Sequence, residues 1–184
     1  MKKTITLMLV VITALLVSSC FQGTTGLTSN TVEIADTTFN NLITAIKSKD
    51  NDEIFEMFAE SVRTVEGFDE NVIALIQYIK GDVVSFSSAI EKSVSASKRT
   101  EKGKKIHSVT SSFSIKTTEK EYFIAVKECV RDDFARSNIG LTSLYIIEAE
   151  EWNEFGAYLG DGLWTPGINI RGQGDGSVVP ADNS

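Results

Sequence analysis

The sequence predicts an α+β domain in which N-terminal helices pack on one face of a four-stranded antiparallel sheet. Two observations carry this prediction. Apolar residues recur at helical spacing up to Ile79 and at alternating spacing after it. Turn residues separate the alternating segments, so that consecutive strands can fold back on one another. A chain that places its helices first and its strands second is typical of the α+β class.

Three helices are expected in the first half of the chain. The first spans residues 31–48 and has one apolar stripe, made of Ala35, Phe39, Leu42, Ile43 and Ile46. A second, shorter helix is expected after a cap at Asn51 or Asp52. Asp69 is expected to cap a third helix, which ends before Gly81, a residue type suited to a helix C-terminus.

The alternating pattern predicts four strands, at residues 82–96, 105–116, 122–130 and 138–149. The polar run from Lys98 to Lys105 is expected to be a solvated connection. Thr117–Lys120 is expected to form a four-residue hairpin turn between the second and third strands.

The first residues have the organisation of an exported precursor. Lys2 and Lys3 precede an uncharged apolar run, Ile5–Val17, which as a helix covers only about 20 Å of a hydrocarbon core of about 30 Å. Small residues then lead to Cys20, a pattern that resembles the lipobox of bacterial lipoproteins, although Val17 stands where that family usually has Leu. The resemblance implies cleavage between Ser19 and Cys20.

A lipobox implies that Cys20 carries a diacylglyceryl group, which anchors the chain in membrane lipid on the extracytoplasmic side of a bacterial cell membrane. The chain then divides into a signal peptide that is removed, a lipidated flexible tether, a single α+β domain and a disordered tail, at residues 1–19, 20–30, 31–170 and 171–184. The aromatic residues between 152 and 164 are expected to dock on the domain, with a partner- or ligand-binding patch as the alternative.

Charge and cysteine content exclude several partners. The chain has a net charge of −7, and processing removes two of its 18 basic residues and none of its 25 acidic ones, which takes the charge to −9. Such a domain is repelled by anionic lipid and by nucleic acid, so we expect neither as a partner of its surface. Lipidation of Cys20 leaves Cys129 alone, which excludes an internal disulfide and a Cys/His zinc site. We expect no cofactor and no bound metal.

His107 and Glu128 are the candidate catalytic residues. If Thr117–Lys120 is the hairpin turn, Val109 faces Glu128 and His107 faces Val130, which puts His107 diagonal to Glu128 with Cβ atoms about 7–8 Å apart or somewhat less. A His–carboxylate pair there would serve as a general base. The alternative is two solvated residues that close the end of the strand, since no nucleophile or oxyanion donor accompanies them.

Cys129 falls on the other sheet face and is expected to be a small apolar filler. The alternative is a reactive thiol whose pKa is lowered by Lys127 and Arg131. The acidic pair Asp132–Asp133 and the acidic cluster Glu148, Glu150, Glu151 and Glu154 are expected to be solvated surface, with weak binding of a divalent cation as the alternative.

Several short motifs resemble known families. The break Lys47-Ser48-Lys49-Asp50 after a first helix is similar to the opening of nuclear-transport-factor-2-like domains. Three further motifs resemble a family of uncharacterised bacterial lipoproteins, domain of unknown function 5104: Ile79-Lys80-Gly81-Asp82-Val83, Ile139-Gly140-Leu141 and Pro166-Gly167-Ile168. The resemblance covers roughly residues 32–170. It implies a cone-shaped fold, nuclear-transport-factor-2-like or cystatin-like, with helices folded over a curved sheet, and it implies no activity.

Three functions remain open. The leading hypothesis is a non-catalytic, membrane-tethered binding module for a small ligand or a protein partner, with a pocket lined by Phe39, Phe58, Phe113 and Ile124. The first rival is a hydrolase- or isomerase-type enzyme that uses His107 with Glu128. The second is a homo-oligomeric assembly subunit, which would form a homodimer through its sheet.

Overall fold

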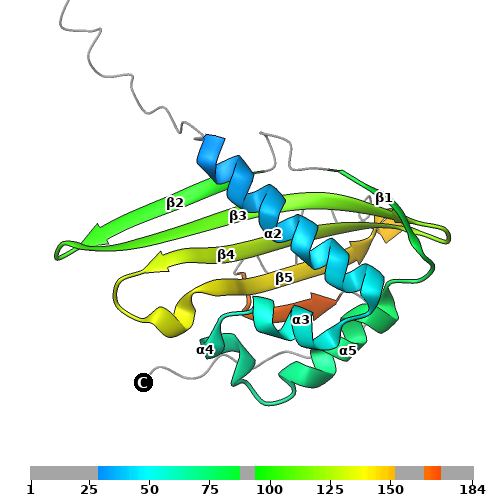
Figure 1. The fold of residues 1–184 in the computed structure, drawn as a ribbon, viewed down its shortest axis with the longest axis horizontal. Coiled ribbons are helices and arrows are strands. Elements are labelled where there is room, and N and C mark those ends of the chain that lie inside the picture. Colours follow the sequence, from blue (N-terminus) through cyan, green and yellow to red (C-terminus); the bar gives the residue numbers. More distant parts are fainter. Residues whose placement is uncertain (1–28, 88–93, 152–163, 171–184) are drawn as a thin grey trace, which may run out of the picture.

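The computed structural model describes residues 29–87, 94–151 and 164–170. They form one six-stranded sheet with helices packed across one of its faces, as Figure 1 shows. The α+β class is therefore confirmed, whereas the sheet has six strands and not the predicted four. The predicted signal peptide, Cys20 and the predicted tail lie outside the described residues, as do most of the aromatic residues between 152 and 164. None of the helices within the described ranges is long and apolar enough to cross a membrane.

The helices begin and end close to the predicted positions. They are α2 (Ser29–Ser48), α3 (Asn51–Met57), α4 (Glu60–Arg63) and α5 (Phe68–Tyr78). The predicted second helix is two short ones, α3 and α4. Its cap is Asp50, whose carboxylate accepts a hydrogen bond of 2.9 Å from the backbone N–H of Glu53, so the predicted caps at the next two residues are wrong. Asp69 lies in the first turn of α5 and does not cap it either.

The strands are β1 (Val83–Phe86), β2 (Val94–Glu101), β3 (Lys104–Thr117), β4 (Glu121–Asp132), β5 (Gly140–Glu148) and β6 (Gly167–Ile170), with a short 3-10 helix, η2 (Arg136–Asn138), before β5. The order in the sheet is β1-β3-β4-β5-β6, and β2 pairs with the other half of β3. The predicted turn between β3 and β4 is confirmed, because the Thr117 N–H donates to the Lys120 carbonyl at 2.8 Å.

Three strand predictions differ from the structure. The single strand predicted at residues 82–96 is two strands, β1 and β2, which pair with different halves of β3. The polar run predicted as a connection is the end of a β2–β3 hairpin, which turns at Lys102 and Gly103 with φ of 50° and 78°. β6 was not predicted at all, and it pairs with β5 in parallel.

The core lies between the helices and the sheet. The predicted apolar stripe of α2 is buried along its whole length. Phe39 of α2 stacks on Phe113 of β3 with ring centroids 3.7 Å apart. The four residues predicted to line a pocket are at most 3% exposed and fill this core: Phe39, Phe58, Phe113 and Ile124. None of them lines the pockets described below.

Gly140 fixes the short helices against the sheet. The Ala59 N–H between α3 and α4 donates to the Leu141 carbonyl of β5 at 2.9 Å. Gly140 has a φ of +125°, and a Cβ added to it would lie 2.9 Å from that same backbone nitrogen. Only glycine allows this approach of two backbones, which accounts for the glycine in the motif Ile139-Gly140-Leu141.

Candidate functional site

His107 and Glu128 are not arranged as the hairpin register predicts. Val109 does face Glu128. A β-bulge between His107 and Ser108 then leaves one β4 residue, Val130, without a partner, so His107 faces Arg131 and the predicted pairing with Val130 is wrong.

The two side chains also have different surroundings. Glu128 accepts a hydrogen bond of 2.6 Å from the Thr38 hydroxyl of α2, and burial raises the pKa of its carboxyl group. The buried Nε2 of His107 has no hydrogen-bond partner, and burial, together with the charge of Lys98, lowers the pKa of its imidazole. Within the described part of the chain the two residues share no hydrogen bond, so the structure does not build the predicted acid–base pair.

The other candidate groups have structural partners. Burial raises the pKa of the Cys129 thiol, so Lys127 and Arg131 do not activate it as the alternative required. Asp132 accepts from the amide of Asn138 and from two backbone N–H groups, and Asp133 forms a two-pronged pair with Arg131. No three metal-ligating side chains cluster among the residues that the structure describes.

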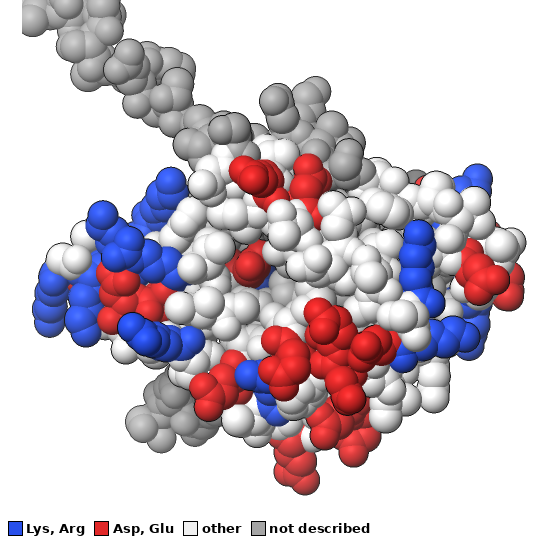
Figure 2. Space-filling view, viewed as in Figure 1, with Lys and Arg blue, Asp and Glu red and all other residues white. Residues whose placement is uncertain are grey.

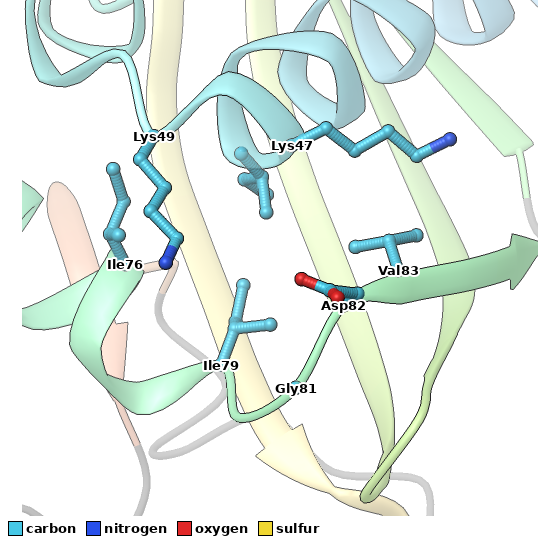
Figure 3. A pocket seen from close by; sticks show the side chains of 8 residues that line it. Lys47, Lys49, Ile76, Ile79, Gly81, Asp82 and Val83 are labelled. Carbon is cyan, nitrogen blue, oxygen red and sulfur yellow. The ribbon is translucent and has the colours of Figure 1, made fainter.

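A pocket lies where the end of α2, the end of α5 and the start of β1 meet (Figure 3). Its volume is about 120 Å³. It is lined by apolar side chains and by charged ones at its rim: Ile46, Ile76, Ile79, Val83, Lys47, Lys49 and Asp82, with Gly81 between. Since a water molecule takes about 30 Å³ of liquid volume, the pocket has room for about four waters. Bonded atoms pack more closely than separate waters, so the pocket suits a ligand of fewer than about ten heavy atoms.

Hydrogen bonds hold the lower rim of the pocket in place. The Thr118 N–H donates to the Asp82 carbonyl at 2.9 Å, and the Asp82 N–H donates to the Thr118 hydroxyl at 3.1 Å. The phenol oxygen of Tyr122, a fully buried residue, accepts from the Lys80 N–H at 2.8 Å. Gly81, with φ +76°, lies so close to Thr118 that an added Cβ would clash. The carboxylate of Asp82 is thus presented from a rigid loop.

Lys49 forms the upper rim in an unfavourable backbone conformation. It follows the last turn of α2 with a φ of 55°, in the hydrogen-bonding pattern of a Schellman cap: its N–H donates to Ile46 and that of Asp50 donates to Ala45. Glycine is the usual residue there, because the left-handed region costs other residues about 1–2 kcal/mol.

Figure 3 shows the side chain of Lys49 reaching toward the space between Ile76 and Ile79, whereas the ammonium of Lys47 points away from it. Lys47 instead lies over the ring of Phe86, 5.5 Å from its centroid. The Lys49 ammonium has no ion pair within the described ranges, so it is available to an anionic group.

Two short motifs in the sequence mark this pocket, although neither motif alone predicts a cavity. The motifs Lys47–Asp50 and Lys80–Asp82 are 30 residues apart in the chain and form opposite rims of one cavity. Two other depressions are larger. One, of about 460 Å³, follows the single stretch of residues 130–139. The other, of about 270 Å³, lies between residues 120–121 and 148–150.

Comparison with known proteins identifies the family. No curated protein matches the chain. A family model described as "Domain of unknown function (DUF5104)" matches residues 41–149, more than half of the chain. The match includes both rims of the pocket and the contact at Gly140. The chain belongs to the family of domain of unknown function 5104.

Proposed function

We propose that this protein is an extracytoplasmic lipoprotein, anchored to a bacterial membrane through Cys20, whose domain binds a small ligand without catalysing a reaction. The proposal for the anchor rests on the sequence of the precursor: two lysines, an apolar run too short to span a bilayer, and small residues that end at Cys20. Two acyl chains on one cysteine are sufficient for stable anchoring.

We further propose that the fold is a nuclear-transport-factor-2-like or cystatin-like cone. The arrangement of one long helix, α2, across a bent and mainly antiparallel sheet supports this assignment (Figure 1). In such a fold a ligand would enter between the helices and one end of the sheet, and the pocket beside Lys49 opens at such an end.

The observation that carries the binding function is Lys49. A residue other than glycine in the left-handed region is strained, and such strain is found preferentially at functional sites. Its ammonium faces the cavity and would bind a carboxylate there. Asp82 on the opposite rim favours a ligand that also carries an ammonium group. A short aliphatic amino acid has this combination of groups and about the right size.

Binding is favoured over catalysis by the surroundings of the two candidate catalytic residues. Glu128 is bonded to Thr38 and not to His107, and neither of them lines the pocket. The homo-oligomeric alternative stays a prediction, which the mass of the purified chain in light scattering will test.

The test of binding uses the chain from residue 21 onward and two probes, valine and butyrate, in calorimetric titrations. We expect valine to bind more tightly than butyrate, because only valine satisfies both rims. Lys49→Gly should abolish binding while stability stays the same or rises, since glycine relieves the strain at this position. Lys47→Ala is the matched control and should bind normally, because its ammonium points away from the pocket. Equal losses in the two variants would refute the site.

The test of the anchor is independent of the ligand. Cys20→Ala should release the protein from the membrane fraction and prevent its labelling with fatty acid, because no acyl group can be attached. If the variant still incorporates labelled fatty acid, Cys20 is not the site of lipidation.

A further inference from the structure

The charges of the described residues are unevenly distributed over the surface. The β2–β3 hairpin, residues 94–105, carries five basic residues and one acidic residue. Residues 50–70, from α3 to α5, carry eight acidic residues and one basic residue. Figure 2 shows basic side chains gathered at the end of the molecule where Figure 1 places the hairpin, and acidic ones along the edge that the helices form. The negative net charge predicts repulsion by anionic lipid, but one end of the domain is basic. The prediction therefore does not hold for that end.

The charges of the hairpin are exposed and mostly without carboxylate partners. Every residue from Ser95 to Lys105 is exposed. Arg99 pairs with Glu101 at 2.9 Å. The remaining basic residues form no ion pair within the part of the chain that the structure describes: Lys98, Lys102, Lys104 and Lys105. Like charges gathered in this way repel one another, and an anionic surface would relieve that repulsion.

An apolar group accompanies the basic hairpin. The ammonium of Lys104 lies 4.8 Å from the ring centroid of Phe134, which is 45% exposed and follows the end of β4. Aromatic rings beside lysines are typical of surfaces that meet the headgroup region of a bilayer.

The hairpin also lies in the half of the domain where the chain enters. α2 begins at Ser29 beside β2 and runs toward the pocket at the far end of the sheet (Figure 1). Residues 20–28 reach at most about 30 Å when fully extended. A lipid on Cys20 therefore keeps the hairpin within reach of the bilayer. The pocket lies at the other end of α2, about 30 Å away for a helix of 20 residues.

We propose that the β2–β3 hairpin docks on the anionic headgroups of the membrane that holds the lipid anchor. This inference rests on the anchor proposed above. Lysine ammonium groups would contact lipid phosphates, and the acidic helices would be repelled, so the domain takes one orientation with its ligand pocket directed away from the bilayer. Each basic residue near an anionic membrane strengthens partitioning about fivefold.

The test uses the chain from residue 21 onward, which contains the whole core cluster, from Ala35 to Ile168, but no acyl group. Its sedimentation with vesicles of equal parts phosphatidylglycerol and phosphatidylcholine is compared with its sedimentation with phosphatidylcholine alone. We expect binding only to the anionic vesicles, and loss of that binding at high salt. The triple variant K98Q/K102Q/K104Q should reduce partitioning by about a hundredfold.

A matched variant, K80Q/K116Q/K120Q, removes three positive charges around the β3–β4 turn and the start of β1, at the opposite end of β3 from the hairpin. Of these, Lys120 pairs with Glu148. Lys104 and Lys116 are 12 residues apart in that strand, or about 40 Å. Partitioning of this control should change by less than about fivefold. Equal losses in the two variants, or equal binding to neutral vesicles, would overturn the proposal.

Two further outcomes are decisive. If light scattering shows an oligomer that the hairpin variant and high salt dissolve, the hairpin binds the acidic helices of a second copy, and the membrane proposal is wrong. If the chain from residue 21 fails to bind anionic vesicles while Cys20→Ala loses its lipid label, the docking fails and the anchor stands. The two proposals therefore fail separately.

Discussion

Replacing Glu128 by glutamine tests whether the charge of this partly buried carboxyl group stabilises or destabilises the folded chain. Glu128 lies under α2, where the Thr38 hydroxyl donates a hydrogen bond to it at 2.6 Å. Glutamine has almost the same shape, and its amide oxygen accepts the same hydrogen bond. Glu128→Gln therefore removes the charge and leaves the packing unchanged.

Two opposing effects set the size of the change in the free energy of unfolding of Glu128→Gln. A hydrogen bond to a charged group contributes about 1.5–3 kcal/mol and a neutral one about 0.5–1.5 kcal/mol, so the substitution loses about 1 kcal/mol. Burying an ionised carboxylate costs several kcal/mol, an amount that partial solvent access at Glu128 reduces. The direction of the pKa shift decides between them: burial raises the pKa of Glu128 despite the hydrogen bond from Thr38. We expect a net gain on the order of 1–2 kcal/mol in the free energy of unfolding at neutral pH.

The pH dependence follows from the same shift. Because the pKa of Glu128 is higher in the folded chain than in the unfolded chain, the folded chain holds the proton more tightly. The contribution of this group to stability is therefore full at low pH and falls as pH rises from the unfolded pKa through the folded pKa. The glutamine side chain does not titrate. The gain in Glu128→Gln should thus be present at about pH 8 and vanish at about pH 4.

Urea unfolding of the chain from residue 21, followed by circular dichroism at both pH values, measures this gain. Thr38→Val is the complementary variant: it leaves the carboxylate without its donor and should cost about 1–3 kcal/mol at high pH and less at low pH. If Glu128→Gln lowers stability at high pH, the carboxylate has a favourable partner and the reasoning is wrong. A gain of the same size at both pH values would refute the role of ionisation.

Three other substitutions or reactions test the fold. Gly140→Ala should cost more than about 3 kcal/mol in urea unfolding, because its Cβ would lie 2.9 Å from a backbone nitrogen of the α3–α4 link, whereas Gly103→Ala meets no atom within 4 Å and should cost about 1–2 kcal/mol; equal costs would contradict the contact. Tyr122→Phe removes the phenol oxygen that holds the α5–β1 link and should cost about 1–3 kcal/mol, and a loss below about 0.5 kcal/mol would show that the link does not depend on it. Cys129 is buried with a raised pKa, so iodoacetamide should modify the unfolded chain and spare the folded one, and rapid labelling of the folded chain would contradict its burial.

The sequence predicts the parts of this fold that local patterns determine. The apolar stripe of α2 repeats at helical spacing, and all five of its predicted members are buried. The β3–β4 register follows from the turn at Thr117–Lys120, because a short turn fixes which residues face one another. Phe113 faces Ile124 and Val109 faces Glu128 as that turn requires.

The parts that were not predicted have weak local patterns. β2 has only one buried residue, Val94. Its charged outer half has no apolar alternation, and such a pattern is typical of a loop. β6 has four residues after a proline, and its parallel pairing with β5 depends on contacts that no short-range pattern contains. The bulge beside His107 adds one residue to β4 without a glycine or proline to mark it, and it moves His107 away from its predicted partner.

The candidate site shows the same limit. Large aromatic residues on facing elements, such as Phe39 and Phe113, were expected to line a cavity, but they are close enough to stack and fill the space themselves. The pocket that the structure does contain is made by the ends of elements. Its position depends on the contact of the Gly81 loop with Thr118, which lies 37 residues later in the chain.

Two lysines with positive φ link the ligand-binding proposal to the membrane-docking proposal. In the part of the chain that the structure describes, the residues other than glycine with positive φ are Lys49, Lys102 and Trp164. At Gly81 and Gly140 a neighbouring segment lies so close to the backbone that a Cβ atom would clash with it, so only glycine fits. At the two lysines glycine would fit and would be more stable by about 1–2 kcal/mol, so local stability does not explain the residue type. One of these lysines faces the pocket and the other lies at the tip of the basic hairpin. Lysine at both positions is explained if its charge stabilises a complex with an anionic ligand or surface. Stability of the fold alone would favour glycine.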